Sequence, residues 1–511
     1  MRASLLPAAA AVALLALASG ARADESAAPA AKVLRVATSG DYAPFSSPDP
    51  AAQAVAGSGD VPPVGFDLDL AAAFARDAGY RVELVRFRWP DLARMLAAGD
   101  FDVAMSGVTI RADRSIAGRY TVPVAATQAF ALTYKGSGVT SAVELDHAGR
   151  RLAVNAGGYL EGIARSTFHR TEIFPIPDND AVRMAMLDRT FDAVLTDNFE
   201  ARIWSASARD VVRIGPLSDD RKALLLPADR GELEAELDRW LLAKESDGTL
   251  ARLRSRWFGG DAAAPGDLVA TAAPLAALAA AVVERQALMP MVYDAKRAVG
   301  KPVEDRAQEE AVLEAASRTL AQAASAASVA APDPEAGKAV FRVLIEIGKD
   351  AQQVLADRDA RHRKGVVIHR DGAAGEAGAA ANDAGAPAGA PAAGDAATGP
   401  APGDDRAAGY GAAPAGAGTA AAVAGATSKD DEALPDPTVR RYDLAAELRP
   451  AISRISDKIA RILLAIDAPV PASEARLRLL AELAGHDVKP ERIGELADAV
   501  AAFSSRRGAA K

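Results

Sequence analysis

The pattern of apolar and polar residues changes near residue 260. Before it, short apolar runs such as VLRVATS at 33–39 and RVELVRF at 81–87 have the length and composition of strands. GFDLDLAAAFARDAGY at 65–80 and WPDLARMLAAGDF at 89–101 instead carry apolar residues at helical spacing. Strands that alternate with helices predict mostly parallel sheets covered by helices, which is an α/β fold.

Three further runs continue this pattern. DVAMSGV at 102–108, RRLAVNAGG at 150–158 and FDAVLTD at 191–197 are predicted strands. The Pro/Ala/Gly-rich insert between Ser46 and Gly65 is predicted to be a loop. We therefore assign residues 33–260 to one α/β domain.

Beyond residue 270 the pattern predicts helices only. The first helical stripe is formed by Leu275, Leu278, Val282, Leu288 and Val292. EAVLEAASRTLAQAASAA continues it, and a long helix is expected to begin at Pro334, because proline suits a first helical turn. Residues 370–436 are almost all Ala, Gly, Pro and Asp, so we predict that they are disordered. An all-α domain is thus expected in two parts, at 271–369 and 437–507.

Composition restricts the location and the partners. Residues 1–23 combine an early Arg, an apolar run and an Ala-x-Ala site, which predicts a cleaved signal peptide and export to the periplasm. No later run of about 18 apolar residues is apparent, so we expect no membrane span. The 511 residues include no cysteine, and the five His lack ligand spacing, so no metal site is expected. The net charge of −9 argues against nucleic acid, and a homo-oligomer remains possible in principle.

The sequence AVNAGGYLEG at 153–162 places a carboxylate where a helix begins. A predicted strand ends at Gly157-Gly158, and Glu161 follows three residues after Gly158. Backbone N–H groups at a helix start favour anions. Glu161 therefore has two interpretations: a surface residue that stabilises the helix, or an acid in a site that binds a carboxylate ligand.

Four motifs resemble the cleft motifs of the type II periplasmic solute-binding proteins for amino acids. They are GDYAPFS at 40–46, GFDLDLA at 65–71, FDVAMSGVTIRADRS at 101–115 and LTDNFEA at 195–201. The resemblance implies a two-lobed α/β domain in which Arg114 clamps the ligand carboxylate, a task that suits a guanidinium fork. It also implies that Thr109 assists Arg114 and that Asp197 receives the ligand's ammonium group. Alternatively, Asp197 is only a helix N-cap.

The resemblance is sharper to one subfamily, the cyclohexadienyl dehydratases, which convert prephenate to phenylpyruvate and arogenate to phenylalanine. The shared features are GDYAPFS, WPDL, SGVTI, Gly-Gly-x-x-Glu, DNDAV, TDNFEAR and RKALLLP. They imply that Tyr42 and Trp89 contact the substrate, although Trp89 could equally be core packing. They also imply that Glu161 is the catalytic acid, which protonates the departing ring hydroxyl because hydroxide is a poor leaving group.

The helical region resembles the exported, all-helical chorismate mutases. Arg285 and Lys296 lie eleven residues apart, close to three helical turns, so they share a helix face. The resemblance implies that these two cations bind the substrate's carboxylates and ether oxygen. It also implies that Glu309 contacts the substrate hydroxyl, that Gln352 faces the ether oxygen and that Arg449 adds a further cation.

Two positions depart from that family. Gln308 stands where it usually has Arg, and Gly348 stands where it usually has a small polar residue. The rearrangement of chorismate is pericyclic and needs no nucleophile or cofactor, so fixed cations and an amide donor are sufficient chemistry.

Together these features predict an exported bifunctional enzyme of phenylalanine biosynthesis. Its substrates would be chorismate, prephenate and arogenate. The alternative is a non-catalytic periplasmic amino-acid receptor with a helical interaction domain whose charges are merely solvated. Glu161 is the residue that would distinguish the two.

Overall fold

The computed structural model describes residues 32–49, 52, 61–206, 208, 210–259, 269–373 and 440–509. The predicted signal peptide and nearly all of the predicted disordered tract lie outside these residues. Contacts divide the chain into two units: residues 1–357 with 441–511, and residues 358–440. Two α/β lobes and the packed helices all belong to the first unit.

The first lobe is built on a five-stranded sheet with the order β4-β1-β5-β14-β6. Its strands are β1 (Lys32–Thr38), β4 (Tyr80–Arg86), β5 (Val103–Ala104), β6 (Gly118–Tyr120) and β14 (Leu225–Pro227). Its helices are α2 (Phe66–Ala78), η1 (Trp89–Asp91), α3 (Leu92–Ala98), α4 (Ala112–Ala117), α9 (Gly231–Ser246) and α10 (Thr249–Phe258). Short strands β2 (Ser47–Pro48) and β3 (Pro63–Val64) pair within the insert that was predicted to be a loop.

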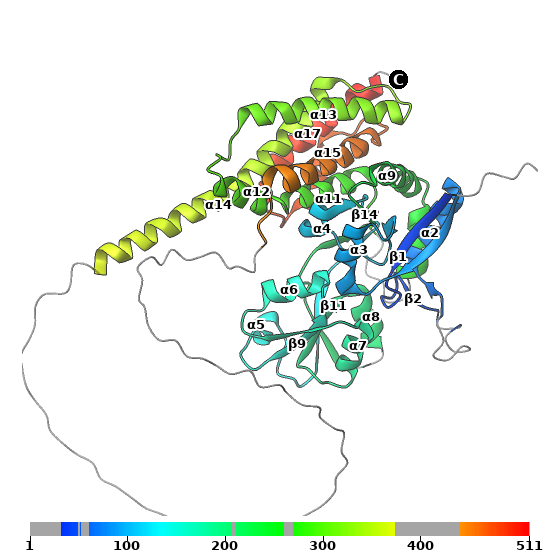
Figure 1. Cartoon of the computed structure of the whole chain (residues 1–511), viewed down its shortest axis with the longest axis vertical. Helices are drawn as coiled ribbons and strands as arrows, with labels where there is room; N and C mark the ends of the chain where they lie inside the picture. Colours follow the sequence, from blue (N-terminus) through cyan, green and yellow to red (C-terminus); the bar gives the residue numbers. More distant parts are fainter. Residues whose placement is uncertain are drawn as a thin grey trace, which may run out of the picture. The chain divides into compact units, whose positions relative to one another are not determined.

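The second lobe has a sheet with the order β10-β9-β11-β8-β12. Its strands are β8 (Ala129–Tyr134), β9 (Arg151–Asn155), β10 (Glu172–Ile176), β11 (Ala193–Asp197) and β12 (Val211–Ile214). Its helices are α5 (Ala142–Leu145), α6 (Tyr159–Thr167), α7 (Asn179–Leu187) and α8 (Asn198–Ala206). Figure 1 shows these helices around the sheet. The strands predicted at 150–158 and 191–197 are confirmed as β9 and β11.

Two antiparallel strands connect the lobes. The chain leaves the first lobe through β7 (Ala125–Thr127) and returns through β13 (Asp220–Lys222), which pair with each other. Because the chain goes out and comes back, β6 and β14 run in opposite directions, and β8 is antiparallel to β11. The prediction of mostly parallel sheets therefore holds for β4-β1-β5 and β10-β9-β11 only.

The rest of the first unit is helical. Its elements are α11 (Pro274–Gln286), α12 (Met289–Ala298), α13 (Arg306–Ala326), α14 (Pro334–Ala373), the π-helical turn η3 (Leu444–Leu448), α15 (Arg449–Leu464), α16 (Ala472–Leu483) and α17 (Pro490–Ala509). The start of α14 at Pro334 confirms the prediction from its sequence. Only the part of α14 up to Asp357 belongs to the first unit.

The first helical stripe is divided between two helices. α11 ends at Gln286, and α12 begins at Met289 with Pro290 in its first turn. By length and mean hydropathy of 1.4, residues 274–298 could cross a membrane, contrary to our expectation that no later segment could. However, 67% of its most apolar window is buried inside the protein, which is typical of a core helix.

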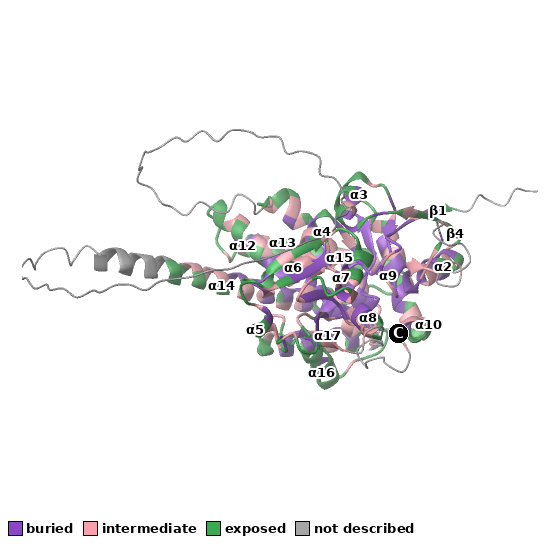
Figure 2. Cartoon of the chain, turned by 90° about the horizontal axis from the view of Figure 1, so that it is seen from below, coloured by how far each residue is buried: buried purple, intermediate pink, exposed green. Residues whose placement is uncertain are grey.

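One hydrophobic core continues from the first lobe into the helical domain. It joins Tyr120 and Leu237 of the lobe to Leu278 of α11 and to Ile455 and Ile459 of α15. Figure 1 shows α11 and α15 beside α4 and α9, and Figure 2 colours the buried residues purple. The second lobe has two separate small cores. The helical domain thus shares a hydrophobic core with the first lobe and not with the second.

Candidate functional sites

The cleft between the lobes holds a cavity of ≈ 40 Å³. The first lobe supplies Tyr42, Trp89, Gly107, Thr109 and Arg114, the connecting strand β13 supplies Lys222, and the second lobe supplies Asn155, Gly158, Tyr159, Leu160, Asn179 and Glu200. The structure thus brings together four predicted residues: Tyr42, Trp89, Thr109 and Arg114. Neither Glu161 nor Asp197 is among the residues that line the cavity.

Arg114 is a buried cation without an acidic partner. It lies on α4, and its guanidinium donates only weakly to the Gly157 carbonyl oxygen, at 3.4 Å. Within the described part of the chain, no carboxylate lies within ion-pair distance of it. Burial lowers the pKa of Arg114, which is the direction expected when a charge has lost water and gained no counter-ion. A carboxylate ligand would supply that counter-ion.

Lys222 is a second cleft cation, which sequence reasoning missed. Its Nζ donates to Thr109 Oγ1 at 2.8 Å, lies 3.6 Å from Asp197 Oδ2 and sits over the Tyr42 ring. The only sequence signal was its place in the motif RKALLLP. Pairing of β13 with β7, together with a bridge between Thr109 and Lys222, brings it into the cleft.

Asp197 has partners on both carboxylate oxygens. Oδ1 accepts from the N–H groups of Phe199 and Glu200 at 2.9 and 3.1 Å, so Asp197 caps α8. Oδ2 accepts from the Tyr42 hydroxyl and faces Lys222. The N-cap interpretation is therefore confirmed, and its role as an ammonium acceptor stays a prediction.

Glu200 is a buried carboxyl group that sequence reasoning did not select. It is 3% exposed and accepts from Asn179 Nδ2 at 2.6 Å and from Thr196 Oγ1 at 2.5 Å. Burial, with the nearby charge of Asp197, raises the pKa of Glu200 well above its ordinary value. A carboxyl group with a raised pKa therefore lines the cleft. In sequence it looks like any Glu in the first turn of a helix.

Glu161 has the opposite environment. Oε2 accepts from the Gly157 N–H at 2.9 Å, and Oε1 accepts from the Arg165 guanidinium at 2.8 Å. Partial burial alone would raise the pKa of Glu161, but these two partners outweigh it, so the pKa is lowered. The contacts match the helix-stabilising interpretation, and a lowered pKa is unfavourable for a general acid at neutral pH.

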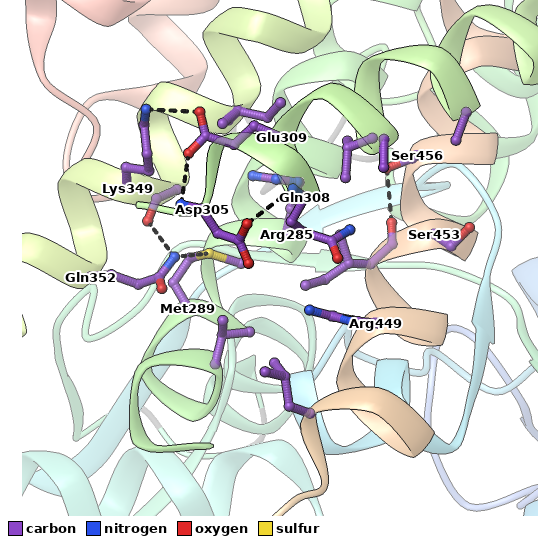
Figure 3. Close-up of a pocket in the computed structure, with 18 of the residues that line it drawn as sticks. Arg285, Met289, Asp305, Gln308, Glu309, Lys349, Gln352, Arg449, Ser453 and Ser456 are labelled. Carbon is purple, nitrogen blue, oxygen red and sulfur yellow. Dashed lines mark hydrogen bonds and ion pairs between the residues drawn. The ribbon is translucent and has the colours of Figure 1, made fainter. Parts of the chain in front are cut away.

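The helical domain contains a second cavity of ≈ 320 Å³, shown in Figure 3. Side chains from α11, α12, α13, α14 and α15 line it. Every residue predicted for this domain is among them: Arg285, Lys296, Glu309, Gln352 and Arg449. Gln308 and Gly348 line it too.

Arg285 is the most isolated cation of this cavity. Its Nη1 donates to the Leu344 carbonyl oxygen at 2.7 Å, and among the described residues it has no carboxylate within ion-pair distance. Burial alone lowers the pKa of Arg285 to about 10. The departure at Gly348 has a steric reason, because a Cβ there would lie only 3.0 Å from Arg285 Nη1 and 3.1 Å from Met289 Sδ.

Two further cations face the same space. Lys296 Nζ donates to the Val303 carbonyl oxygen at 2.7 Å, and burial lowers the pKa of Lys296. Arg449 is the first residue of α15, directly after η3. Lys296 and Arg285 lie on different helices, so the predicted single face is wrong in detail. Both nevertheless line one cavity, because α12 continues in nearly the same direction after the break.

The amide and the acid of the predicted set are held by local bonds. Gln352 Nε2 donates to the Gly348 carbonyl oxygen at 3.0 Å, whereas the buried Oε1 lacks a partner within the described chain. Glu309 accepts from Lys349 Nζ at 3.2 Å and from the Asp305 N–H at 3.3 Å. Glu309 therefore closes the first turn of α13, which is a structural role whatever else it does.

Comparison with known proteins places the α/β part. Residues 34–260 match the family model of bacterial extracellular solute-binding proteins, family 3. The cyclohexadienyl dehydratase of Pseudomonas aeruginosa is 31% identical over 231 residues, which cover 44% of this chain and 82% of that protein. The chain belongs to the family 3 extracellular solute-binding proteins.

Two further proteins are similar to this chain at lower identity. The arginine-binding extracellular protein ArtP of Bacillus subtilis is 26% identical over 242 residues, 45% of this chain and 88% of that protein. The crystal structure of the ancestral amino acid-binding protein AncCDT-1, a precursor of cyclohexadienyl dehydratase, is 27% identical, with a TM-score of 0.40 over 44% of this chain and 95% of that chain. The family model ends at residue 260, before the helical domain begins.

Neither site offers an obvious metal centre. In the ranges that the structure describes, no three His, Asp or Glu side chains come together as metal ligands would.

Proposed function

We propose that the chain is an exported bifunctional enzyme that makes and consumes prephenate. The helical cavity would convert chorismate to prephenate. The interlobe cleft would convert prephenate to phenylpyruvate, or arogenate to phenylalanine. The product of the helical cavity would be the substrate of the cleft, and neither step requires a cofactor.

The dehydratase half rests on Glu200 and on the relative from Pseudomonas aeruginosa. In the reaction the ring C–OH bond breaks as the hydroxyl takes a proton, and the electrons of the ring C–carboxylate bond aromatise the ring as CO₂ leaves. A buried acid with a raised pKa can hold that proton at neutral pH. We assign this role to Glu200 in place of Glu161, with Arg114 and Lys222 as the cations that bind the two carboxylates of prephenate.

The neighbours of Asp197 favour prephenate over an amino acid. An ammonium group needs an accessible acid, but the Asp197 carboxylate is engaged by Tyr42, Lys222 and the start of α8. The ligand that fits such a cleft is an anion without an ammonium group. Arogenate, which keeps its ammonium group, would then be the poorer substrate.

The mutase half rests on the unpaired Arg285. A half-buried guanidinium without a counter-ion is costly, so a cavity that keeps one is suited to an anionic ligand. With Lys296 and Arg449 it can hold the two carboxylates of chorismate in the reactive conformer. If the Gln352 amide presents its N–H₂ to the cavity, it can stabilise the charge that develops on the breaking ether oxygen.

The alternative is a receptor that binds an amino acid and has no activity. Similarity to the arginine-binding protein ArtP supports it. Incubation of the protein with chorismate separates the two functions. We expect chorismate to disappear, prephenate to rise and fall, and phenylpyruvate to accumulate, as followed by ultraviolet absorbance and chromatography. Chorismate that persists together with added prephenate that persists would favour the receptor.

The periplasm is the proposed location. Family 3 proteins are extracellular solute-binding proteins, and residues 1–23 have the composition of a signal peptide. Fractionation of cells that express the chain, with phenylpyruvate formation measured in each fraction, tests this location.

A further inference from the structure

Helix α15 has two functional faces. One lines the helical cavity with Arg449, Ile452, Ser453, Ser456 and Asp457. The other carries Arg454, Lys458 and Arg461, spaced four and three residues apart, and it packs on α4, β6 and α9 of the first lobe. The helix therefore stands between the two proposed sites.

Arg454 holds the end of the helix that carries the clamp. Its guanidinium donates to the carbonyl oxygens of Ser115 at 3.1 Å, Ile116 at 2.8 Å and Gly118 at 3.1 Å. These carbonyls belong to the end of α4 and the residue after it, where helical carbonyls lack partners of their own. Arg114 lies one residue before Ser115, so Arg454 fixes the backbone that aims the clamp.

A buried ion pair reinforces this contact. Glu284 of α11 accepts from Ser115 Oγ at 2.8 Å and from Lys458 Nζ at 2.6 Å, and both side chains of the pair are at most 3% exposed. Lys458 Nζ also donates to the Tyr120 carbonyl oxygen at 2.8 Å. A pair this deeply buried holds its elements at fixed positions, because losing one partner would strand the other charge.

The same contacts reach a second cleft residue. The Tyr120 hydroxyl donates to the Thr109 carbonyl oxygen at 2.8 Å, and Thr109 Oγ1 accepts from Lys222. Lys458 is thus connected through Tyr120 to Thr109 and Lys222, while Arg454 is connected directly to the turn after Arg114. Both cleft cations are therefore linked to α15, Arg114 through the backbone that follows it and Lys222 through this series of hydrogen bonds.

Residues of the helical domain also line a cavity next to the cleft. A cavity of ≈ 350 Å³ is lined by Arg111 and Asp220 from the first lobe and β13, by Tyr159 and Ile163 from the second lobe, and by residues of α11 and α16. Tyr159 lines this cavity and the cleft as well. An ion pair between Arg221 and Glu482, at 2.7 Å, holds α16 beside it.

We propose that the helical domain is part of the N-terminal site: Arg454, Lys458 and Glu284 are positioning residues for the carboxylate clamp Arg114. Residues 33–260 alone would then form an incomplete cleft. The proposal concerns the geometry of the clamp, and its kinetic test rests on the proposed dehydratase function.

The experiment compares Arg454→Gln with the wild-type full chain. Hydrogen–deuterium exchange of residues 112–118 should speed up, because three carbonyl contacts are lost. KM for prephenate should rise on the order of tenfold with kcat changed less, since a misaimed clamp weakens binding first. Arg454→Lys should recover part of the loss. Chorismate consumption should stay within about twofold of the wild type, a change too small to indicate a lost contact at the reacting atoms.

Two further variants keep the test decisive. Arg492→Gln is the control, because Arg492 is likewise a partly buried arginine with several partners, but it pairs with Asp350 inside the helical domain and touches no lobe residue among the described ones. Ser115→Ala removes one bond to Glu284 without stranding its charge, so it should fold and raise KM by about two- to threefold, the effect of one lost hydrogen bond.

Unchanged exchange at 112–118 in Arg454→Gln would overturn the proposal. So would faster exchange with an unchanged KM, because Arg454 would then hold α4 without aiming Arg114. A wild-type protein that forms no phenylpyruvate would instead reject the dehydratase function. In that case exchange at 112–118, measured with and without prephenate, still decides whether the helical domain supports the clamp helix.

Discussion

The interlobe cleft leaves ≈ 40 Å³ of free space, whereas the helical cavity leaves ≈ 320 Å³. In the cleft, Lys222 has Asp197 and Thr109 as partners, and Arg111 and Arg114 of one lobe both donate to Gly157 of the other. In the helical cavity, Arg285 donates to a backbone carbonyl and, among the described residues, has no carboxylate within ion-pair distance. The two lobes are closed against each other, so little free space remains in the cleft. The helical cavity is open, and its buried cation Arg285 has no counter-ion among the described residues.

This difference teaches how each fold can hold an anion. Two lobes joined by β7 and β13 can separate, so ligand groups can replace contacts that the closed lobes make with each other. Helices packed in one core cannot separate, so their cavity must be formed in advance with its charges unsatisfied. Catalysis in the helical cavity should therefore depend most on single cations, and catalysis in the cleft on a single protonated acid.

The largest effect is expected in the helical cavity. Arg285→Ala should lower chorismate conversion by about 10³-fold, because it removes a buried cation that holds a substrate carboxylate in the reactive conformer. Prephenate turnover in the cleft should be unaffected. Stopped assays on each substrate measure both. Loss of less than about threefold would mean that the cavity is not a mutase site, since it falls far below the cost of a lost transition-state contact.

The next effect distinguishes two acids in the α/β domain. Glu200→Gln should lower prephenate turnover by ~10²–10³-fold, a typical loss for a general acid. Glu161→Gln, its matched control, should cost little turnover and some helix stability, because Glu161 binds the Gly157 N–H before α6 and pairs with Arg165 within it. The reverse result, with Glu161→Gln inactive and Glu200→Gln active, would restore the assignment made from the sequence motif.

Binding to the cleft should depend on its unpaired cation. Arg114→Ala should weaken the binding of prephenate to the cleft by about 2–4 kcal/mol, the scale of a desolvated charge pair. Titration calorimetry in an Arg285→Ala background, where the helical cavity is disabled, isolates this event. An affinity equal to that of the Arg285→Ala protein would show that the carboxylate is held elsewhere.

The pH dependence follows from the raised pKa of Glu200. The folded protein holds this proton to a higher pH than the unfolded chain, which releases it at the ordinary Glu pKa. Stability from this group is therefore present at low pH and declines as pH rises from the ordinary value toward the raised one. Dehydratase kcat should fall at pH above the raised pKa. Glu200→Gln should remove the decline in melting temperature, and an unchanged profile would contradict the assignment.

The smallest effect concerns the family departure at Gly348. Gly348→Ser would place a Cβ 3.0 Å from Arg285 Nη1, so the guanidinium must shift by a few tenths of an ångström. Chorismate conversion should fall by roughly three- to tenfold, because a small displacement in a preformed site costs transition-state contacts. Gly162→Ser is the control, because a Cβ at Gly162 meets no atom within 4 Å. Gly485→Ser is less suitable, because Gly485 has a φ of 87°, where a side chain is strained.

Most elements followed from local pattern. The helices at 65–80 and 89–101 and the strands at 33–39 and 150–158 were predicted because their apolar spacing is unambiguous. The break between α11 and α12 was missed, because Leu288 and Val292 keep the helical spacing across it and Pro290 was not read as a helix start. The antiparallel strands β8 and β14 were missed, because a chain that crosses between lobes twice leaves no local signal of direction.

Some residues of the candidate sites were likewise predicted from the sequence, and others were missed. Arg285, Lys296, Gln352 and Arg449 were named from motifs and do line one cavity. Helical geometry fixes which side chains share a face only within one helix, and these four residues lie on α11, α12, α14 and α15, so the packing of the helices brings them together. Lys222 was missed although it lies within a motif, because only the pairing of β13 with β7 brings it to the cleft.

The sequence by itself determined the α/β and all-α regions, the family motifs and the residue types that could bind carboxylates. Only the tertiary structure decided which of two candidate glutamates has a raised pKa. Glu161 and Glu200 each lie in the first turn of a helix. They differ because Glu200 is desolvated and lies near Asp197, whereas Glu161 lies beside Arg165 and the Gly157 N–H. A pKa depends on burial by groups far apart in the chain, and no local pattern encodes that burial.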